Sequence, residues 1–203
     1  YIFQTDEAET GTALIMVDEN TSQNEIVVVL GSCNQITDQE VDSLSPVLEE
    51  SEYLLTQLET NVSAVERIVA LAEKKGVKVI LNPAPVQKIS DEENAKKAAD
   101  WFMDKGVKSV IITLGGRGVY VASEEKRKLI PAFKVNAIDT TGAGDAFNGG
   151  LVTALAEDKD LFEATRFANA LAALSVQRIG TTPSMPIRSE IEAFLETSRY
   201  QES

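Results

Sequence analysis

The stretch of sequence that decides the fold is the glycine-rich run Asp139-Thr140-Thr141-Gly142-Ala143-Gly144-Asp145. The apolar residues from Val135 to Ile138 predict a strand before it, and an apolar helix is predicted to open at about Asp145. A glycine turn between a strand and a helix stacks backbone amides at the positive end of the helix dipole, where an anion is stabilised. The run therefore predicts a binding site for a phosphate group.

Asp145 lies at the mouth of this predicted anion site. A carboxylate there can accept the proton of an attacking hydroxyl, while the backbone amides of Gly142, Ala143 and Gly144 neutralise charge that grows on the phosphoryl group. The chain contains no histidine, so acid–base chemistry falls to other groups, carboxylates first among them. The alternative is that Asp145 only caps the helix N-terminus after a glycine-containing loop.

A second glycine cluster ends another predicted strand, which runs from Val110 to Leu114. Its residues are Thr113-Leu114-Gly115-Gly116-Arg117-Gly118. The cluster would lie at the carboxyl edge of the sheet, where open α/β sheets bind ligands, and two such clusters on neighbouring strands favour a nucleotide site. The alternative is a tight hairpin turn that leads into a partner strand over Gly118 to Val121.

The rest of the chain alternates predicted strands and helices, which indicates a mostly parallel sheet covered by helices on both faces. The predicted strands are 12–17, 25–30, 53–58, 77–81, 110–114 and 118–121, and the predicted helices are 38–48, 62–75, 92–105, 147–155, 161–176 and 187–197. The first two strands are joined by a polar turn and form a predicted hairpin. We expect residues 1–35 to form this hairpin and its connection, and residues 36–203 to form one α/β domain.

Two features suggest that parts of the expected fold are absent. The segment from Leu81 to Pro85 ends a strand, yet a helix is predicted only about seven residues later, without the strand that such a sheet normally supplies. We therefore expect a missing internal segment near Ile89 and Ser90. The chain also begins with Tyr1 in place of an initiator methionine, which predicts that this N-terminus is not the natural one.

Composition excludes several classes of protein. The chain has 203 residues, of which 43% are hydrophobic, and a formal net charge of −13, so a nucleic-acid partner is not expected. No apolar run reaches the roughly 18 to 20 residues that a membrane-spanning helix needs. Cys33 is the single cysteine, which rules out an internal disulfide and predicts a cytoplasmic setting, with Cys33 itself buried or half-buried.

The run from Asp139 to Gly150 resembles the second signature of the ribokinase-like (PfkB) carbohydrate kinases. Further matches follow the family's order along essentially the whole chain, at Gln57-Leu58-Glu59, Leu81 to Pro85, Thr113 to Gly118 and Gly180 to Pro186. The resemblance implies a three-layer α/β/α fold with a mostly parallel central sheet and a small β lid. It also implies transfer of a phosphoryl group from ATP to the 5-hydroxyl of D-ribose, with Mg²⁺ and activation by a monovalent cation, K⁺ in our expectation.

The resemblance assigns roles to residues of this chain. Asp145 would be the catalytic base and, with Glu59, would contact the sugar, and the amides of Gly142, Ala143 and Gly144 would stabilise the transferred group. The implied ATP contacts are Thr113, Leu114, Gly115, Gly116, Arg117, Gly118, Gly144, Asp145 and Asn169. The implied monovalent-cation positions are Asp139, Thr141, Ser175, Arg178, Gly180 and Ser184. The hairpin would be the lid, which covers the sugar and joins two subunits in a homodimer.

This chain departs from the family pattern in two places. The family's N-terminal sugar-binding motif has no counterpart before Tyr1, and an Asn-x-x-Glu motif that helps to place Mg²⁺ is missing after Ile89. Two alternatives therefore stay open. The chain could act on another sugar or on a nucleoside, or it could be a catalytically incomplete module that binds nucleotide.

Overall fold

A computed structural model describes residues 1–18, 24–83, 89 and 91–199. The polar turn predicted around residues 19–23 and most of the predicted break near Ile89 and Ser90 lie outside the described residues. The chain packs as two compact units, one holding Tyr1–Met16 and Glu25–Gln87 and the other holding Val17–Asn24 and Lys88–Ser203. The division predicted at residue 35 stays a prediction.

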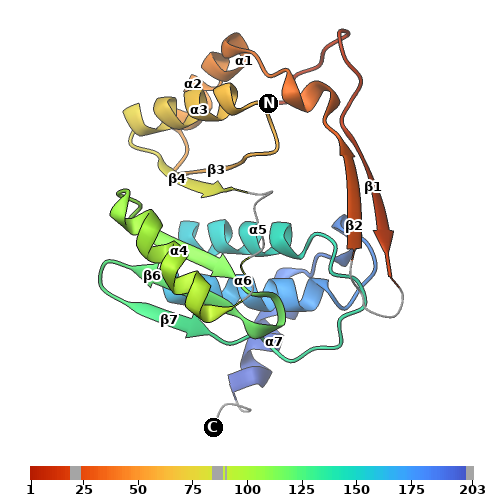
Figure 1. The fold of residues 1–203 in the computed structure, drawn as a ribbon, viewed down its shortest axis with the longest axis vertical. Helices are drawn as coiled ribbons and strands as arrows, with labels where there is room; N and C mark the ends of the chain where they lie inside the picture. Colours follow the sequence, from red (N-terminus) through yellow and green to blue (C-terminus); the bar gives the residue numbers. More distant parts are fainter. Residues whose placement is uncertain (19–23, 84–88, 90, 200–203) are drawn as a thin grey trace. The chain divides into compact units, whose positions relative to one another are not determined.

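The two N-terminal strands, β1 (Thr12–Val17) and β2 (Asn24–Val29), pair in a two-stranded sheet, as the sequence predicts (Figure 1). Their side chains are largely apolar and yet exposed, Leu14 and Val29 each to 64%. A short 3₁₀ turn, η1 (Gly31–Asn34), follows the hairpin. Cys33 in this turn is exposed, so the expectation of a buried cysteine is wrong.

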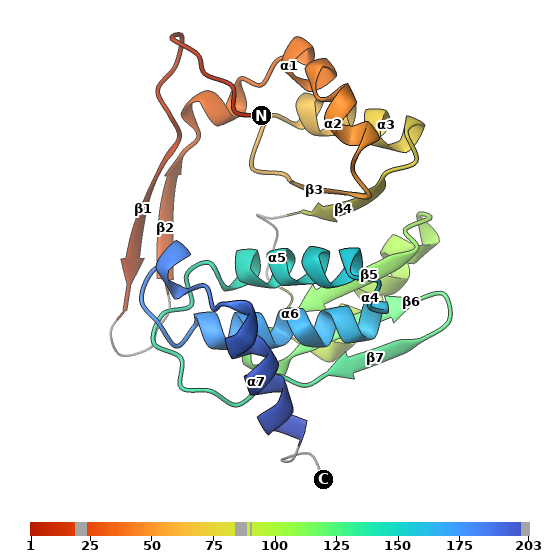
Figure 2. The same cartoon turned by 180° about the vertical axis from the view of Figure 1, so that it is seen from behind.

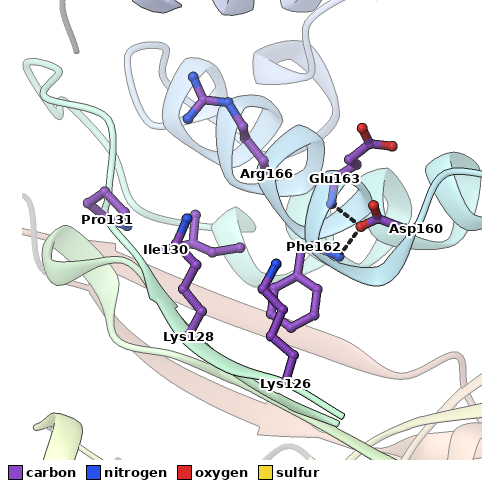
Figure 3. A pocket seen from close by; sticks show the side chains of 8 residues that line it. All are labelled: Lys126, Lys128, Ile130, Pro131, Asp160, Phe162, Glu163 and Arg166. Carbon is purple, nitrogen blue, oxygen red and sulfur yellow. Dashed lines mark hydrogen bonds between the residues drawn. The ribbon is translucent and has the colours of Figure 1, made fainter. Parts of the chain in front are cut away.

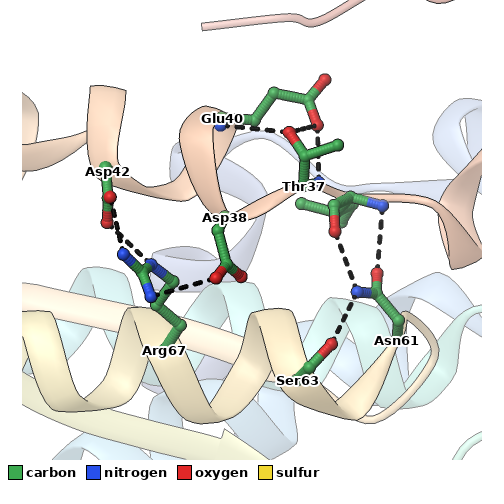
Figure 4. A network of polar contacts seen from close by, with 8 residues as sticks. Thr37, Asp38, Glu40, Asp42, Asn61, Ser63 and Arg67 are labelled. Atoms are coloured by element: carbon green, nitrogen blue, oxygen red, sulfur yellow. Dashed lines mark hydrogen bonds and ion pairs between the residues drawn. The ribbon is translucent and has the colours of Figure 1, made fainter.

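The helix predicted over residues 38–48 is two short helices, α1 (Asp38–Ser43) and α2 (Ser45–Glu49). The start is as predicted, because the Thr37 side chain accepts from the Glu40 amide while the Glu40 carboxylate accepts from the Thr37 amide. Pro46 explains the break, since it has no amide hydrogen to donate to the preceding turn. Figure 4 shows this cap and, beside it, Arg67 bridging Asp38 and Asp42.

A βαβ unit follows, made of β3 (Tyr53–Gln57), α3 (Val62–Lys74) and β4 (Lys78–Asn82). The strands pair in parallel with Tyr53 opposite Lys78, which confirms the predicted βαβ pattern. Gly76 stops α3 with a φ of 73°, a backbone conformation that glycine adopts without strain. Buried side chains of α1, α2 and α3 form one apolar core with the neighbouring strands.

The second unit begins with α4 (Glu92–Asp104) and an antiparallel sheet of β5 (Ser109–Thr113), β6 (Val119–Ser123) and β7 (Arg127–Ile130). The prediction of a mostly parallel sheet is therefore not met among the described strands, where only β3 and β4 pair in parallel. The connections from β5 to β6 and from β6 to β7 are too short for the crossover that parallel strands require. Strand β7 lies outside the strands predicted from the sequence.

Helices cover both faces of this sheet (Figure 2). On β6, Val119 and Val121 pack with α5 (Ala143–Ala156) and α6 (Leu161–Ser175), whereas Tyr120 and Ala122 pack with α4. The helices α5 and α6 lie side by side and approach closely, because a Cβ at Gly150 would be 3.1 Å from the Ala168 Cα. The unit therefore has three layers of its own.

The segment that leads into the glycine run differs from the prediction. Residues 131–138 form no strand, and α5 opens at Ala143, two residues earlier than expected. After α6 the chain passes through a 3₁₀ turn, η3 (Thr182–Ser184), into the last helix, α7 (Arg188–Arg199). Within the part of the chain that the structure describes, no helix is both long and apolar enough to span a membrane.

Candidate phosphoryl-transfer site

The glycine run forms a tight turn that opens α5. Gly142 is the N-cap residue, with φ 74° and ψ 4°, and its carbonyl accepts from the Ala146 amide at 2.8 Å. This left-handed conformation is costly for any residue with a Cβ, which explains a glycine here. Gly144 and Asp145 in the first turn are exposed, and a Cβ built on Gly144 would meet no atom within 4 Å. An anion can therefore approach the main chain at this helix N-terminus.

The buried side chain of Asp139 holds the backbone of the turn in place. This side chain is only 4% exposed, and its two carboxylate oxygens accept hydrogen bonds from the Thr141 amide and the Gly180 amide, each at 2.9 Å. The Thr141 hydroxyl, then the Gly180 and Thr141 amides, hold the pKa of Asp139 below its usual range. Asp139 is therefore an anchor that is charged at neutral pH, and it joins two segments that lie far apart in the sequence.

Further bonds tie the turn to the end of α6. The amides of Ile138 and Asp139 both donate to the Val176 carbonyl, at 2.7 and 3.1 Å. Thr181 lies against the turn, since a Cβ at Gly142 would be 3.3 Å from its Cγ2 atom. The geometry of the glycine turn thus depends on residues 176–181.

The predicted monovalent-cation residues are partly brought together. Asp139, Thr141 and Gly180 are in direct contact through the bonds just described. Ser175 and Ser184 are buried, and their hydroxyls donate to the carbonyls of Ala172 and Thr181, at 2.9 and 2.6 Å. The Arg178 guanidinium pairs with Glu190 and, being itself a cation, cannot bind another, so the group of Arg178 suited to a cation is its backbone carbonyl.

The donor atoms at this place are carboxylate, hydroxyl and carbonyl oxygens, which suit hard cations such as K⁺. Each Asp139 oxygen accepts one amide hydrogen bond and keeps lone-pair capacity for a further contact. Among the described residues, no three Asp, Glu or Cys side chains cluster closely enough to form a metal cage. Mg²⁺ is usually held by one or two carboxylates together with nucleotide phosphates.

The second glycine cluster is the connection from β5 to β6, and it contains a 3₁₀ turn, η2 (Gly115–Arg117). The Leu114 amide donates to the Gly118 carbonyl at 2.7 Å, so the hairpin interpretation is confirmed. Gly118 has a φ of 107°, and its Cβ would lie 2.0 Å from the Ile130 carbonyl oxygen. Gly115 and Gly116 are exposed and open, which leaves room for a nucleotide over the same turn.

The two remaining predicted site residues lie in different units. Asn169 of α6 is 7% exposed, and its Nδ2 atom donates to the Pro131 carbonyl at 2.9 Å. This bond joins α6 to the segment that packs on Gly118. Glu59 is exposed on the turn after β3 in the first unit, whereas Asp145 belongs to the second.

Two features of this site were not predicted from the sequence. The first is the support from Val176 and Thr181, for which the residue types gave no signal. The second is Asn148, one turn after Asp145, whose buried Nδ2 atom has no hydrogen-bond partner among the described residues. Its place on the same helix as Asp145 was visible in the sequence, but burial of the amide was not.

The chain belongs to the pfkB family of carbohydrate kinases, whose family model matches residues 85–188. Ribokinases are among its similar relatives: the ribokinase of Haemophilus influenzae is 42% identical, over 92% of this chain and 69% of the relative. The crystal structure of Thermotoga maritima ribokinase is 37% identical with a TM-score of 0.80, over 93% of this chain and 70% of that one. The structure of Arabidopsis thaliana ribokinase complexed with ribose and ATP is 26% identical, with a TM-score of 0.79 and coverage of 93% and 70%.

These matches establish the ribokinase-like α/β fold for the chain. They also show that it is shorter than its relatives. The alignment with the Haemophilus influenzae protein runs over 213 residues, whereas 92% of 203 is only about 187, so that relative has internal residues without a counterpart here. The predicted position of the missing segment, near Ile89, stays a prediction.

Proposed function

We propose that this protein transfers the γ-phosphoryl group of ATP to the 5-hydroxyl of D-ribose, giving D-ribose 5-phosphate and ADP. The observation that carries the proposal is the Gly142 turn, which opens α5 with the carboxylate of Asp145 exposed in the first helical turn. A helix N-terminus with an adjacent carboxylate supplies the two things that phosphoryl transfer needs, neutralisation of growing negative charge and removal of a proton.

In the proposed reaction, the Asp145 carboxylate accepts the proton of the 5-hydroxyl as that oxygen forms its bond to the γ-phosphorus. The bond between the γ-phosphorus and the bridging oxygen breaks, and ADP leaves with the electron pair. The amides around Gly142, Ala143 and Gly144 hold the equatorial oxygens of the phosphoryl group. The first amides of a helix lack intrahelical acceptors, so they can serve this role without breaking the helix. The Ala143 amide makes a long bond of 3.3 Å to the Thr140 carbonyl, which it would exchange for the phosphoryl oxygen.

Support for the nucleotide site comes from the open face of the second glycine cluster. The exposed glycines Gly115 and Gly116 would admit the ATP phosphates and ribose, with Thr113, Arg117 and Gly118 completing the loop. Asn169 would lie against the nucleotide. Mg²⁺, when bound with ATP, offsets the charge of the β- and γ-phosphates.

A monovalent cation is proposed at the Asp139 anchor. Asp139 is hydrogen-bonded to the amides of Thr141 and Gly180. Further oxygens would come from three residues close to Gly180 in the sequence, Ser175, Arg178 and Ser184, and the Ser184 hydroxyl is hydrogen-bonded to the Thr181 carbonyl. A cation there would stiffen the base of the glycine turn. The exposed apolar strands β1 and β2 support the proposal of a lid that pairs with a second copy.

One relative favours a second candidate substrate. The deoxyribokinase of Salmonella typhi is 28% identical over 96% of this chain, which makes 2-deoxy-D-ribose a reasonable alternative acceptor. Glu59 is the proposed sugar contact in the described chain. A chain that binds ATP but phosphorylates no sugar would instead be a nucleotide-binding module.

The test replaces Asp145 with Asn, which keeps the shape of the side chain and removes its basicity. We expect turnover with ATP and D-ribose to fall by about a thousandfold or more, with ATP binding by calorimetry nearly unchanged. Asp104→Asn, an exposed change on α4, is the matched control. A panel of D-ribose, 2-deoxy-D-ribose and adenosine, read by ADP release, separates the candidate acceptors. Unchanged turnover in the Asp145 variant would rule out its role as the base.

A further inference from the structure

A cavity of about 560 Å³ lies between strand β7 and the first turns of helix α6 (Figure 3). It is separate from the glycine turn at the start of α5. The side chains that line it are those of Lys126, Lys128, Ile130, Pro131, Asp160, Phe162, Glu163 and Arg166. Its volume is in the range that small organic ligands occupy in proteins.

The alternation of side chains along β7 places Lys128 on the face of the strand that lines the cavity. Leu129 packs with the core under α4 and Arg127 pairs with Asp100 of α4, whereas Ile130 packs with the core under α5 and α6. Because strand side chains alternate between faces, Lys128 shares the α6 face with Ile130. Figure 3 shows Lys128 of β7, and Lys126 just before that strand, reaching toward α6.

The cavity gathers positive charge in an acidic protein. The chain has 19 Lys and Arg residues against 32 Asp and Glu residues, yet three cations line this one hollow. Two carboxylates, those of Asp160 and Glu163, also line it, so the cations exceed the carboxylates by one. Asp160 accepts from the Phe162 and Glu163 amides, at 2.8 and 2.9 Å, as the cap of α6. Lysines on an edge strand are common because they discourage pairing with another strand, but that role does not require a cavity beside them.

The walls between the cations are apolar. Ile130, Pro131 and the ring of Phe162 face the hollow, and Lys126 lies over that ring with its Nζ atom 4.4 Å from the ring centre. A ligand that matches these walls carries a compact apolar body and a doubly charged anionic group. Phosphate monoesters have this combination, and their oxygens pair well with lysine and arginine.

We propose that this cavity is a binding site for a phosphate monoester, held by Lys128 and Arg166 at its phosphate and by Ile130, Pro131 and Phe162 at its organic part. The site would be in contact with the predicted nucleotide loop. Pro131 accepts the hydrogen bond of Asn169, and the neighbouring Ile130 carbonyl packs on Gly118. A ligand against this wall would therefore change nucleotide affinity, and nucleotide would change its affinity by the same factor.

Phenyl phosphate is a suitable probe, because it has neither a nucleobase nor a sugar. Binding to the whole chain is measured by amide chemical shifts in NMR spectra, with saturating ADP and Mg²⁺ present to fill the nucleotide site. Phenol and inorganic phosphate are titrated separately to divide the apolar contribution from the anionic one. The measurement does not depend on catalysis, and Asp145→Asn should bind the probe as the native chain does.

We expect saturable shifts at residues 126–131 and 160–166, with weaker binding of phenol and of inorganic phosphate. Lys128→Glu should weaken phenyl phosphate binding at least about tenfold, which is about 1.4 kcal/mol, whereas the exposed control Lys108→Glu should leave it unchanged. The proposal would be overturned if no saturable shifts appeared up to about 10 mM phenyl phosphate, a concentration that corresponds to about the weakest binding of interest. Equal losses in the two charge variants would overturn it too.

Discussion

Two glycines of the same turn should respond in opposite ways to a single added methyl group. Gly142→Ala puts a Cβ on a residue with φ 74°, which costs roughly 1–2 kcal/mol. The new Cβ would also come within 3.3 Å of the Thr181 Cγ2 atom, a tight contact that an exposed side chain can relieve by a small shift. We expect the free energy of unfolding to fall by about 1–2 kcal/mol.

Gly144→Ala is the matched counterpart, two residues along the same helix. Its backbone φ is not positive, and its Cβ would meet nothing within 4 Å. Alanine there removes freedom from the unfolded chain and favours the helix, so stability should rise by about 0.5–1 kcal/mol. The methyl group nevertheless occupies the space through which a phosphate would reach the amides, so kcat with ATP and D-ribose should fall.

The assay is urea unfolding followed by circular dichroism, with ADP release measured on the same preparations. The reasoning about backbone strain would be refuted if Gly142→Ala were as stable as the native chain. The assignment of the turn to the phosphate would be refuted if Gly144→Ala kept kcat within about twofold, a change of about 0.4 kcal/mol. The two results are independent, because one concerns the fold and the other the ligand.

Two further predictions concern charge. Asp139→Asn should lower stability at pH 7 by about 2 kcal/mol, because a charged acceptor of two buried amides is replaced by a neutral one. The pKa of Asp139 is lowered in the folded state, so its contribution is present above the unfolded pKa of about 3.9 and is lost as the pH falls through the folded value. The stability difference between the two chains in urea unfolding should therefore shrink as the pH falls below about 3.9, and a difference that stays constant with pH would contradict this. Arg188 pairs with Glu157 and lowers the pKa of that carboxyl to about 2. Arg188→Gln should therefore return the Glu157 pKa toward about 4.3 in an NMR titration. A pKa still near 2 would exclude the pair as the cause.

The helices of this chain were largely predictable because their signals are local. Thr37 and Glu40 form the capping box that their spacing suggests, and Gly76 ends α3 where the apolar periodicity stops. The break at Leu44 was also present in the sequence as Pro46, and it was missed because the apolar pattern continues through it. Local signals therefore fix where helices begin and end to within a few residues.

Strand partners were less predictable, since pairing depends on residues far apart in the chain. The residues from Val135 to Ile138 have the composition of a strand, yet the amide of Ile138 donates to Val176 at the end of α6 and not to a neighbouring strand. A propensity describes what a segment favours alone, and tertiary contacts override it. The motif gave the position of Asp145 and the turn, but nothing in the residue types indicated what supports them.

The bond between Asp139 and Gly180 spans 41 positions of the chain. A ribosome delivers residues in order, so the glycine turn leaves it well before the partner that completes its geometry. Helix α6 and the residues after it must be made before Asp139 has both of its amide donors. The site should therefore form late in the folding of its unit, and a chain that stops short of Gly180 should bind phosphate poorly even where α5 has formed.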